Sequence, residues 1–234
     1  MDNIYLVMPA YNEAENIESV VNSWYGILKD KGENSRLVVA DSGSTDDTHE
    51  ILVRLQQKYP RLIILSNTRR EHGPKIIALY NYAVKSGADY IFQTDSDGQT
   101  NPDEFSRFWK LRNKYDAVIG KRVSRGDGKT RALVEKVLCM ILYLYYHVSI
   151  PDANAPFRLM KSELVKKYLE KLPIDYDLPN VMLTTFFVYF KERVKFVNIT
   201  FAARQGGVNS VNMIRIMKTG WKSLSDFYII RKNL

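Results

Sequence analysis

Short apolar runs alternate with longer segments of helical periodicity through the first half of this 234-residue chain. A short, nearly continuous apolar run is typical of a strand that is buried on both faces. Five runs have this character: residues 3–8 (NIYLVM), 36–41 (RLVVAD), 61–66 (RLIILS), 89–94 (DYIFQT) and 116–120 (DAVIG). Strands of this kind, separated by helices, predict an α/β domain with a central, mostly parallel sheet flanked by helices.

The segments between these runs carry their apolar residues on one helical face. In residues 13–31, apolar positions recur at helical spacing, and Gly32 is expected to end the helix. Further helices are predicted over residues 44–59, 74–86 and 101–115, where acidic residues, Ser or Pro stand in the first turns.

The alternation ends near residue 130. A long apolar helix is predicted over residues 131–148, and RVKFVNITFAAR (193–204) has the pattern of a strand. We therefore expect one domain over residues 1–210, followed by a basic amphipathic helical tail over residues 211–234.

Composition narrows the classes of protein. With 45% hydrophobic and 26% charged residues, the chain has the make-up of a globular protein. The single cysteine, Cys139, cannot form an intrachain disulfide, and three scattered histidines do not predict a zinc site. The apolar runs are shorter than the roughly 20 residues that a spanning helix needs, and no signal peptide is recognisable. We expect a cytoplasmic protein, soluble or peripheral to a membrane.

Polar motifs follow four of the predicted strands. PAYNE (9–13) follows the first strand, DSGSTD (41–46) the second, DSDGQ (95–99) the fourth and GKR (120–122) the fifth. In open parallel sheets, ligands bind beyond the carboxyl ends of the strands. We therefore expect all four motifs at one edge of the sheet, called the carboxyl edge below.

Oxygen-bearing side chains gather in the DSDGQ motif. Asp95 and Asp97 are one residue apart, and Gln99 follows. Asp is common in turns, so the pair alone is a weak signal, but Glu13 and Asp41 are expected at the same edge. Hard oxygen ligands without His or Cys suit Mg²⁺ or Mn²⁺, and such an ion would neutralise a diphosphate leaving group.

The DSGSTD motif has the features of a nucleotide pocket. Asp41, at a strand end, can accept hydrogen bonds from base N–H groups, and Gly43 allows close backbone approach. Tyr11 offers a stacking face for a base. A turn followed by a helix N-cap explains Ser44 to Asp47 equally well, but it leaves Asp41 unexplained.

With these residues in place, the chain closely resembles glycosyltransferase family 2, which has the GT-A (Rossmann-like) fold. Within the family, it is most similar to the polyprenyl-phosphate glycosyltransferases of the dolichol-phosphate mannose synthase type. The resemblance covers about residues 3–210 and implies a nucleotide-binding half over about 1–122 and an acceptor half over about 123–210.

The resemblance assigns roles to the nucleotide-binding motifs. MPAYNE implies a nucleoside site lined by Pro9, Ala10, Tyr11 and Glu13, and ADSGSTD implies a base contact from Asp41 beside Gly43, although Ala40 replaces the family's first acid. DSDGQ implies that Asp95, Asp97 and Gln99 surround the metal and that Asp95 and Ser96 lie beside the nucleotide.

The resemblance also assigns the acceptor side. GKR and DANAPFR (152–158) match two later motifs, and Arg122 and Arg131 would bind an acceptor phosphate. RQGGVNS (204–210) matches a third, in which Arg204 would approach the donor phosphates.

One departure bears on the acceptor. Family members that glycosylate a hydroxyl usually carry an acidic base where this chain has Asn180, which cannot take a proton near neutral pH. A phosphate needs no such base, because its second pKa is about 6 and it arrives as an anion. The sequence thus favours a lipid-phosphate acceptor, whereas Asp175 or Asp177 would supply a base for a hydroxyl acceptor if the alignment shifts.

Charge is concentrated near the C-terminus. The formal charge is +8, and from Arg204 onward six basic residues face one acid, Asp226. A stripe of apolar residues shares one side of the predicted tail helix, with basic residues nearby: Met213, Ile214, Met217, Trp221, Leu224 and Tyr228, beside Arg215, Lys218 and Lys222. The stripe can pack on the domain or touch an anionic membrane, with or without a separate membrane protein.

The resulting hypothesis is a metal-dependent, inverting glycosyltransferase. It would move a sugar from a UDP- or GDP-linked donor to a polyprenyl phosphate at the inner membrane face, using Asp95, Asp97, Arg122 and Arg131. Three alternatives are a transferase acting on a glycan hydroxyl, a nucleotidyltransferase, and a nucleic-acid-binding protein. The last lacks any recognisable binding motif, so no nucleic acid is expected as a partner.

Overall fold

A computed structural model describes residues 1–125, 129–203, 213–232 and 234. Within this part of the chain, one sheet contains seven strands in the order β3-β2-β1-β4-β6-β5-β7. The strands are β1 (Ile4–Ala10), β2 (Arg36–Asp41), β3 (Leu62–Leu65), β4 (Tyr90–Gln93), β5 (Ala117–Arg125), β6 (Arg158–Lys161) and β7 (Val194–Phe201). Among these strands β6 alone runs antiparallel to its neighbours, so the predicted mostly parallel sheet is confirmed.

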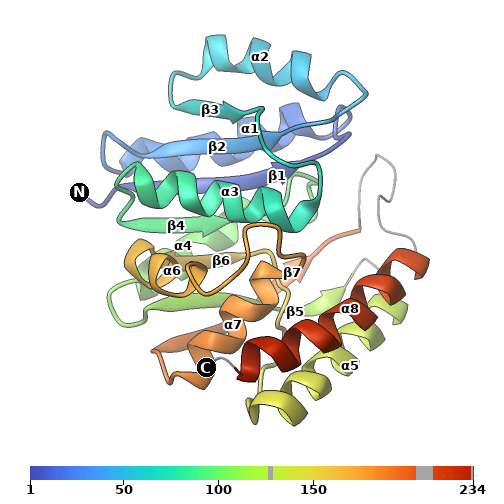
Figure 1. Cartoon of the computed structure of the whole chain (residues 1–234). Helices are drawn as coiled ribbons and strands as arrows, with labels where there is room; N and C mark the ends of the chain where they lie inside the picture. The colour runs from blue at the N-terminus through green and yellow to red at the C-terminus, as the bar shows by residue number, and fades with distance from the viewer. Residues whose placement is uncertain (126–128, 204–212, 233) are drawn as a thin grey trace.

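Helices cover both faces of the sheet (Figure 1). They are α1 (Ile17–Tyr25), η1 (Gly26–Asp30), α2 (Thr48–Lys58), α3 (His72–Lys85), η2 (Pro102–Glu104), α4 (Phe105–Leu111), α5 (Lys129–Tyr146), α6 (Ser162–Leu169), α7 (Pro179–Tyr189) and α8 (Met213–Lys232). Among these helices, none is both long and apolar enough to cross a bilayer.

Two hydrophobic cores lie on the two faces, and alternation along the strands divides their residues. In β1, Tyr5 and Val7 face the core under α3, α6 and α7, whereas Leu6 and Met8 face the core under α1 and α4. Trp24 is among the largest buried side chains of the second core, and its truncation to Ala would cost about 3–5 kcal/mol.

The five strands of the first half lie where the hydrophobic runs predicted them, and two features of the sheet differ. The four-residue β6 was not predicted, because its core Arg158 interrupts the apolar pattern. The GKR motif, expected beyond the fifth strand, lies inside β5, because β7 pairs with it from Ala117 to Arg125. Space at Gly120 is tight, since a Cβ there would lie 2.7 Å from the end of the Ile199 side chain and 3.0 Å from the Phe157 carbonyl oxygen.

The tail helix α8 packs against α5. The Tyr146 hydroxyl donates to the Phe227 carbonyl over 2.8 Å, and Phe227 and Ser223 are buried. Tyr228, a member of the predicted apolar stripe, is 61% exposed, because it lies about 100° around the helix from Phe227. The side chains of Met213, Ile214, Arg215, Met217, Lys218 and Trp221 lie outside the described residues.

Candidate active site

The loops after β1 and β2 are joined by hydrogen bonds between side chains and backbone. Asn12, in the left-handed region with a φ of 54°, accepts a bond from the Thr45 backbone N–H over 2.8 Å. Its own N–H donates to the Ser44 hydroxyl over 3.1 Å, and the N–H of Glu13 donates to Thr48 over 2.8 Å. The PAYNE and DSGSTD motifs therefore form one unit at the carboxyl edge.

Asp41 ends β2 with a buried carboxylate inside this unit. One of its oxygens accepts a hydrogen bond from the Ser44 hydroxyl, and the other lies 3.0 Å from Nδ1 of His49. The turn that follows uses Gly43 at a φ of +75°, where a Cβ would also lie 3.3 Å from the side chain of Arg70. The predicted base-contacting acid is thus held in a fixed orientation.

Two basic side chains stand beside Tyr11, and the sequence reasoning missed both. The Arg70 guanidinium lies 4.6 Å from the Tyr11 ring centre and donates to its hydroxyl. Lys75, on α3, is only 1% exposed, and its Nζ donates to the Ala10 carbonyl over 2.5 Å. Burial lowers the pKa of Lys75 to about 8, opposed by the charge of Asp41. Both cations therefore border the predicted nucleoside site.

A signal for Lys75 exists in the sequence. It precedes the apolar residues Ile76 and Ile77 and stands just after Pro74, in the first turn of α3. A cation is disfavoured there by the helix dipole, so a lysine in an apolar first turn indicates that its charge has another use.

The acidic motif after β4 is tied to the first motif. The hydroxyl of buried Ser96 donates to the Pro9 carbonyl over 2.8 Å, and Asp97 Oδ1 accepts the Gln99 N–H over 3.1 Å. Gly98, at a φ of +73°, makes the turn. Gln99 Nε2 donates to the Ala202 carbonyl over 2.7 Å, so the side-chain oxygen of Gln99 is the atom that remains for a cation.

The donor set of this motif fits a hard divalent cation. Asp95 and Asp97 supply carboxylate oxygens and Gln99 an amide oxygen, and Mg²⁺ commonly takes one or two carboxylates together with substrate phosphates. Within the described ranges, no group of three His, Cys, Asp or Glu side chains forms a complete metal site. The motif therefore suits an ion that is shared with a bound phosphate.

Arg122 lies in a buried ion pair. Its guanidinium donates to Asp152 through Nε (2.8 Å) and Nη2 (2.7 Å) and lies 3.3 Å from Glu135, with 7% of its side chain exposed. The sequence predicted an arginine presented to an acceptor; in the structure, two carboxylates balance its charge. Arg131, predicted beside it, is half-buried in the first turn of α5, one helical turn before Glu135.

Glu135 is a third residue that the sequence analysis did not predict. It accepts the Ala153 backbone N–H over 2.8 Å and that of Asn154 over 3.3 Å, which fixes the DANAPFR motif against α5. Burial, and then the charge of Asp152, raise the pKa of Glu135. Cys139, one turn later, is half-buried and its pKa is raised to about 12 by burial, so it is no nucleophile.

A buried polar layer connects α3, β4 and α7 below the acidic motif. The Tyr80 hydroxyl donates to the Asn180 side-chain oxygen over 2.9 Å and also contacts Gln93. Arg158, fully buried, donates to the carbonyls of Ala155 (2.6 Å) and Asn180 (3.0 Å). Asn180, the residue at the expected base position, therefore has a structural role in this hydrogen-bond layer. Its amide cannot act as a general base.

The alternative bases lie on the surface and are paired. Asp177 lies 2.7 Å from Lys222 of α8, and Asp175 lies 3.7 Å from Arg69. The Asp175–Asp177 loop lies directly against α3 at Gly73. A Cβ at Gly73 would lie 2.4 Å from the Asp177 carbonyl oxygen, so only glycine allows this approach. Lys222, one of the basic residues beside the predicted stripe, thus ties α8 to this loop.

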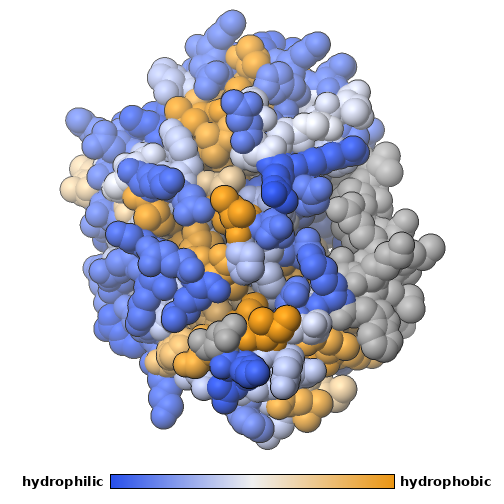
Figure 2. All heavy atoms as spheres, viewed as in Figure 1, coloured by the Kyte–Doolittle hydropathy of each residue, from blue (hydrophilic) through white to orange (hydrophobic). Residues whose placement is uncertain are grey.

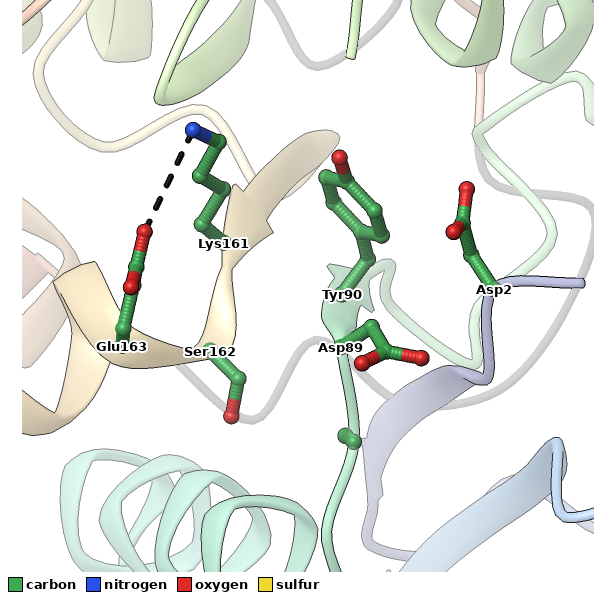
Figure 3. Close-up of a pocket in the computed structure, with 7 residues that line it drawn as sticks. Asp2, Asp89, Tyr90, Lys161, Ser162 and Glu163 are labelled. Atoms are coloured by element: carbon green, nitrogen blue, oxygen red, sulfur yellow. Dashed lines mark ion pairs between the residues drawn. The ribbon is translucent and has the colours of Figure 1, made fainter. Parts of the chain in front are cut away.

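One predicted residue and one surface hollow are not part of the site described above. Arg204, predicted to approach the donor phosphates, lies outside the described residues. Figure 3 shows a hollow lined by residues at the start of β4 and the end of β6: Asp2, Ala88, Asp89, Tyr90, Lys161, Ser162 and Glu163. It lies at the edge opposite the motifs, so it plays no part in this site.

Comparison with known proteins gives the family. The sequence model of the family described as Glycosyl transferase family 2 matches residues 5–169. This range includes the PAYNE, DSGSTD, DSDGQ, GKR and DANAPFR motifs. The chain belongs to glycosyl transferase family 2. The family resemblance of the sequence is confirmed, and the sheet with its flanking helices is that of the GT-A fold.

Similar proteins include two bacterial transferases of the same name. The chain is 23% identical to undecaprenyl-phosphate 4-deoxy-4-formamido-L-arabinose transferase of Pectobacterium atrosepticum, over 92% of this chain and 64% of the relative. It is 25% identical to the enzyme of the same name from Photorhabdus laumondii, over 71% and 51%. The chain thus spans about half to two thirds of the length of these relatives.

The chain is also similar to one further protein over a shorter stretch and to a solved structure over nearly its whole length. Succinoglycan biosynthesis protein ExoA of Rhizobium meliloti is 38% identical over 43% of this chain and 29% of its own length. Glucosyl-3-phosphoglycerate synthase from Mycobacterium tuberculosis, crystallised with Mn²⁺ and UDP-glucose, has a TM-score of 0.71 at 18% identity, covering 99% of this chain and 79% of its own. This structural likeness supports the fold.

Proposed function

We propose that this glycosyl transferase family 2 protein is a metal-dependent, inverting enzyme that transfers a sugar from a nucleoside-diphosphate sugar to a polyprenyl phosphate at a membrane surface. The observation that carries the proposal is the joining of three motifs at the carboxyl edge, through Ser96 to Pro9 and Asn12 to Ser44. The undecaprenyl-phosphate transferases among the relatives support the acceptor class.

The donor half would hold the nucleotide through complementary chemistry. Asp41 would accept a base N–H, Tyr11 would stack on the base, and the adjacent Lys75 would donate to a base carbonyl. An acceptor beside a donor suits the imide edge of uracil and the N1–O6 edge of guanine alike. Glu13 would line the pocket behind Tyr11 through its tie to Thr48.

Asp95, Asp97 and Gln99 would hold Mg²⁺ or Mn²⁺. When bound, the ion supplies positive charge to the diphosphate as negative charge develops on the leaving group. Ser96, hydrogen-bonded to Pro9, would keep the two carboxylates in register with the nucleoside pocket. A relative of the same fold has been crystallised with Mn²⁺ and UDP-glucose, which supports this choice of metal and donor.

Within the described residues of the acceptor half, the candidate base positions are engaged with other partners, which favours a phosphate acceptor. Asn180 is committed to Tyr80 and to Arg158, and Asp175 and Asp177 face cations on the surface. A phosphate oxygen is already anionic near neutral pH and can attack the anomeric carbon directly. The new bond joins that carbon to the acceptor oxygen, and the nucleoside diphosphate leaves with the electrons of the old bond.

Two arginines would organise this acceptor. Arg131 lies on α5 one turn before Glu135, and we assign it the direct contact with the phosphate. Arg122, locked by Asp152, would act as a positioning residue that keeps α5 and the DANAPFR motif beside the metal site.

The test offers one donor and two acceptors. Purified protein with Mn²⁺ and UDP- or GDP-sugars should glycosylate undecaprenyl phosphate and leave a simple alkyl glycoside unmodified. Transfer to the glycoside alone would replace the proposal with a hydroxyl-specific transferase. Release of pyrophosphate in place of nucleoside diphosphate would indicate a nucleotidyltransferase.

A further inference from the structure

The outer edge of β7 is covered by side chains from one short segment. In the described part of the chain, β7 is an edge strand, so every second residue turns its backbone N–H and C=O away from β5. Three residues at a spacing of two, Asn198, Thr200 and Ala202, are bonded there by side chains of residues 99–107. The segment that begins in the acidic motif thus takes the place of an eighth strand.

Gln99 forms the first contact, with two hydrogen bonds to Ala202. Its Nε2 donates to the Ala202 carbonyl over 2.7 Å, and its own carbonyl accepts the Ala202 N–H over 2.8 Å. The position of Ala202 therefore fixes the side-chain oxygen of Gln99, the atom that remains for a cation. Thr94 and Thr100, whose buried hydroxyls lie 2.6 Å apart, close the base of the same loop.

Glu104 and Arg107 form the other two contacts, on the strand just before Ala202. Glu104 accepts the Thr200 N–H over 3.2 Å, and Arg107 donates to the Asn198 carbonyl over 3.2 Å. The two side chains also pair with each other over 2.5 Å, and only 13% of the Glu104 side chain is exposed. This mostly buried carboxylate and its arginine therefore determine where the end of β7 lies.

Core packing holds the two polar side chains in place. Helix α4 lies on the far face of the sheet in Figure 1, and its Phe105 and Phe108 are buried in the core beneath it. Figure 2 shows the opposite face, over α3 and α6, where hydrophilic side chains predominate. Each phenylalanine is adjacent in sequence to Glu104 or Arg107, so the core fixes both residues and, through them, the end of β7.

We propose that Glu104 and Arg107 are positioning residues for the metal site. They hold the end of β7, so Ala202 keeps the side-chain oxygen of Gln99 in place as a ligand. The inference rests on the proposed function, since it concerns a ligand of the metal proposed there. The acidic motif is then held from two sides, by the first motif and by β7.

The first experiment measures Mn²⁺ binding in the presence of UDP or GDP, from the electron paramagnetic resonance signal of free Mn²⁺. Glu104→Ala should raise the Kd of Mn²⁺ about tenfold, because the Thr200 N–H loses its acceptor. Glu104→Gln keeps an oxygen acceptor and should return the Kd to within about twofold of the parental value. Arg107→Ala should also raise the Kd, and by less, because its side chain is half exposed. Asp103→Ala, an exposed acid one residue before Glu104, is the matched control and should bind as the parent does.

A second measurement separates this inference from the proposed function. Transfer to undecaprenyl phosphate at rising Mn²⁺ should need more Mn²⁺ in Glu104→Ala, with a kcat within about twofold of the parent once Mn²⁺ saturates. A Kd that depends on Glu104, in a protein that transfers sugar to neither acceptor, would support the positioning role and remove the proposed function.

Three results would overturn the inference. The first is an unchanged Kd in Glu104→Ala or in Arg107→Ala. The second is an equal loss in Glu104→Gln and Glu104→Ala, because the bond to the Thr200 N–H would then not be what matters. The third is a parent protein that binds no Mn²⁺ beside the nucleotide.

Discussion

The side chain of Ser96 donates a hydrogen bond to the carbonyl oxygen of Pro9 over 2.8 Å, linking residues 87 positions apart in the sequence. Both residues are buried at the carboxyl edge of the sheet. The bond fixes the distance between the acidic motif and the first motif, so it couples the predicted metal-binding carboxylates to the predicted nucleoside pocket.

Removal of this bond should have a measurable cost. Ser96→Ala leaves the Pro9 carbonyl without its donor and should lower the free energy of unfolding by about 1–3 kcal/mol, measured by urea denaturation. It should also weaken Mn²⁺-dependent binding of a nucleoside diphosphate. The control is Ser106→Ala, an exposed serine on α4, which should change neither quantity. Unaltered nucleotide binding in Ser96→Ala would separate the two motifs.

The acidic motif should be required for metal-dependent binding. Asp97→Ala should abolish the thermal stabilisation that Mn²⁺ adds to a nucleoside diphosphate, and should abolish turnover, while the fold persists because Asp97 lies in a loop. Asp103→Asn, an exposed acid in η2, is the matched control. Full activity of Asp97→Ala, or of the parent in excess chelator, would remove the metal from the proposal.

Lys75 should make nucleotide affinity depend on pH. Its pKa in the folded protein is lowered to about 8 by burial, so the ammonium loses its proton as the pH rises above about 8. The Kd of UDP or GDP, measured by calorimetry, should therefore rise above that pH. Lys75→Arg should give a flat profile over the same range, and Lys75→Met should bind about tenfold more weakly throughout. A parental profile in Lys75→Met would exclude this contact.

Lys75 should affect the pH dependence of stability in the opposite direction: stability rises with pH where nucleotide affinity falls. Unfolded Lys75 has its ordinary pKa near 10.4, so between about pH 8 and that value the unfolded chain binds the extra proton. The contribution of Lys75 to stability therefore rises with pH across this window. In Lys75→Met that rise should be absent from urea denaturation measured at successive pH values.

Asp116 should contribute to stability only while it is ionised. Hydrogen bonds from Arg193 and Lys161 hold its pKa well below the usual range, so its stabilisation is complete above about pH 4 and is lost as the pH falls further. Asp116→Asn should cost about 1 kcal/mol at pH 7, because water screens these partly exposed pairs, and less at lower pH. Glu163→Gln, whose carboxylate is 82% exposed, should be neutral at both pH values.

Much of the fold could be predicted from the sequence because hydrophobic periodicity is a local signal. The strands from Ile4–Ala10 to Ala117–Arg125 and the helices between them follow directly from it. The antiparallel strand Arg158–Lys161 could not be predicted, since it is short and its buried arginine finds its carbonyl partners only in the folded chain, at the nearby Ala155 and at Asn180, 22 residues away. The α8 stripe stays a prediction, because the side chains of four of its members lie outside the described residues: Met213, Ile214, Met217 and Trp221.

The site divides in the same way. The motif residues Pro9, Asp41 and Asp95 gather at one edge because parallel strands end there, which sequence order predicts. The contribution of Glu135 could not be predicted, because its role comes from a three-dimensional neighbour, the Ala153 N–H. Lys75 did carry a signal, a cation in an apolar first turn, although its partner, the Ala10 carbonyl, is apparent only in the structure.

Strand β6 lies between β4 and β5 and runs against both, so Ile119 and Arg158 pair directly across the sheet. The chain therefore departs from the sheet after β5 and returns beside the place it left, enclosing α5 and the DANAPFR motif in a single excursion. Such an excursion is a natural cassette for exchange. An exchange between relatives would have to keep the contacts of Leu142 and Tyr146, which are buried in the same core as Tyr5 and Val7 of β1.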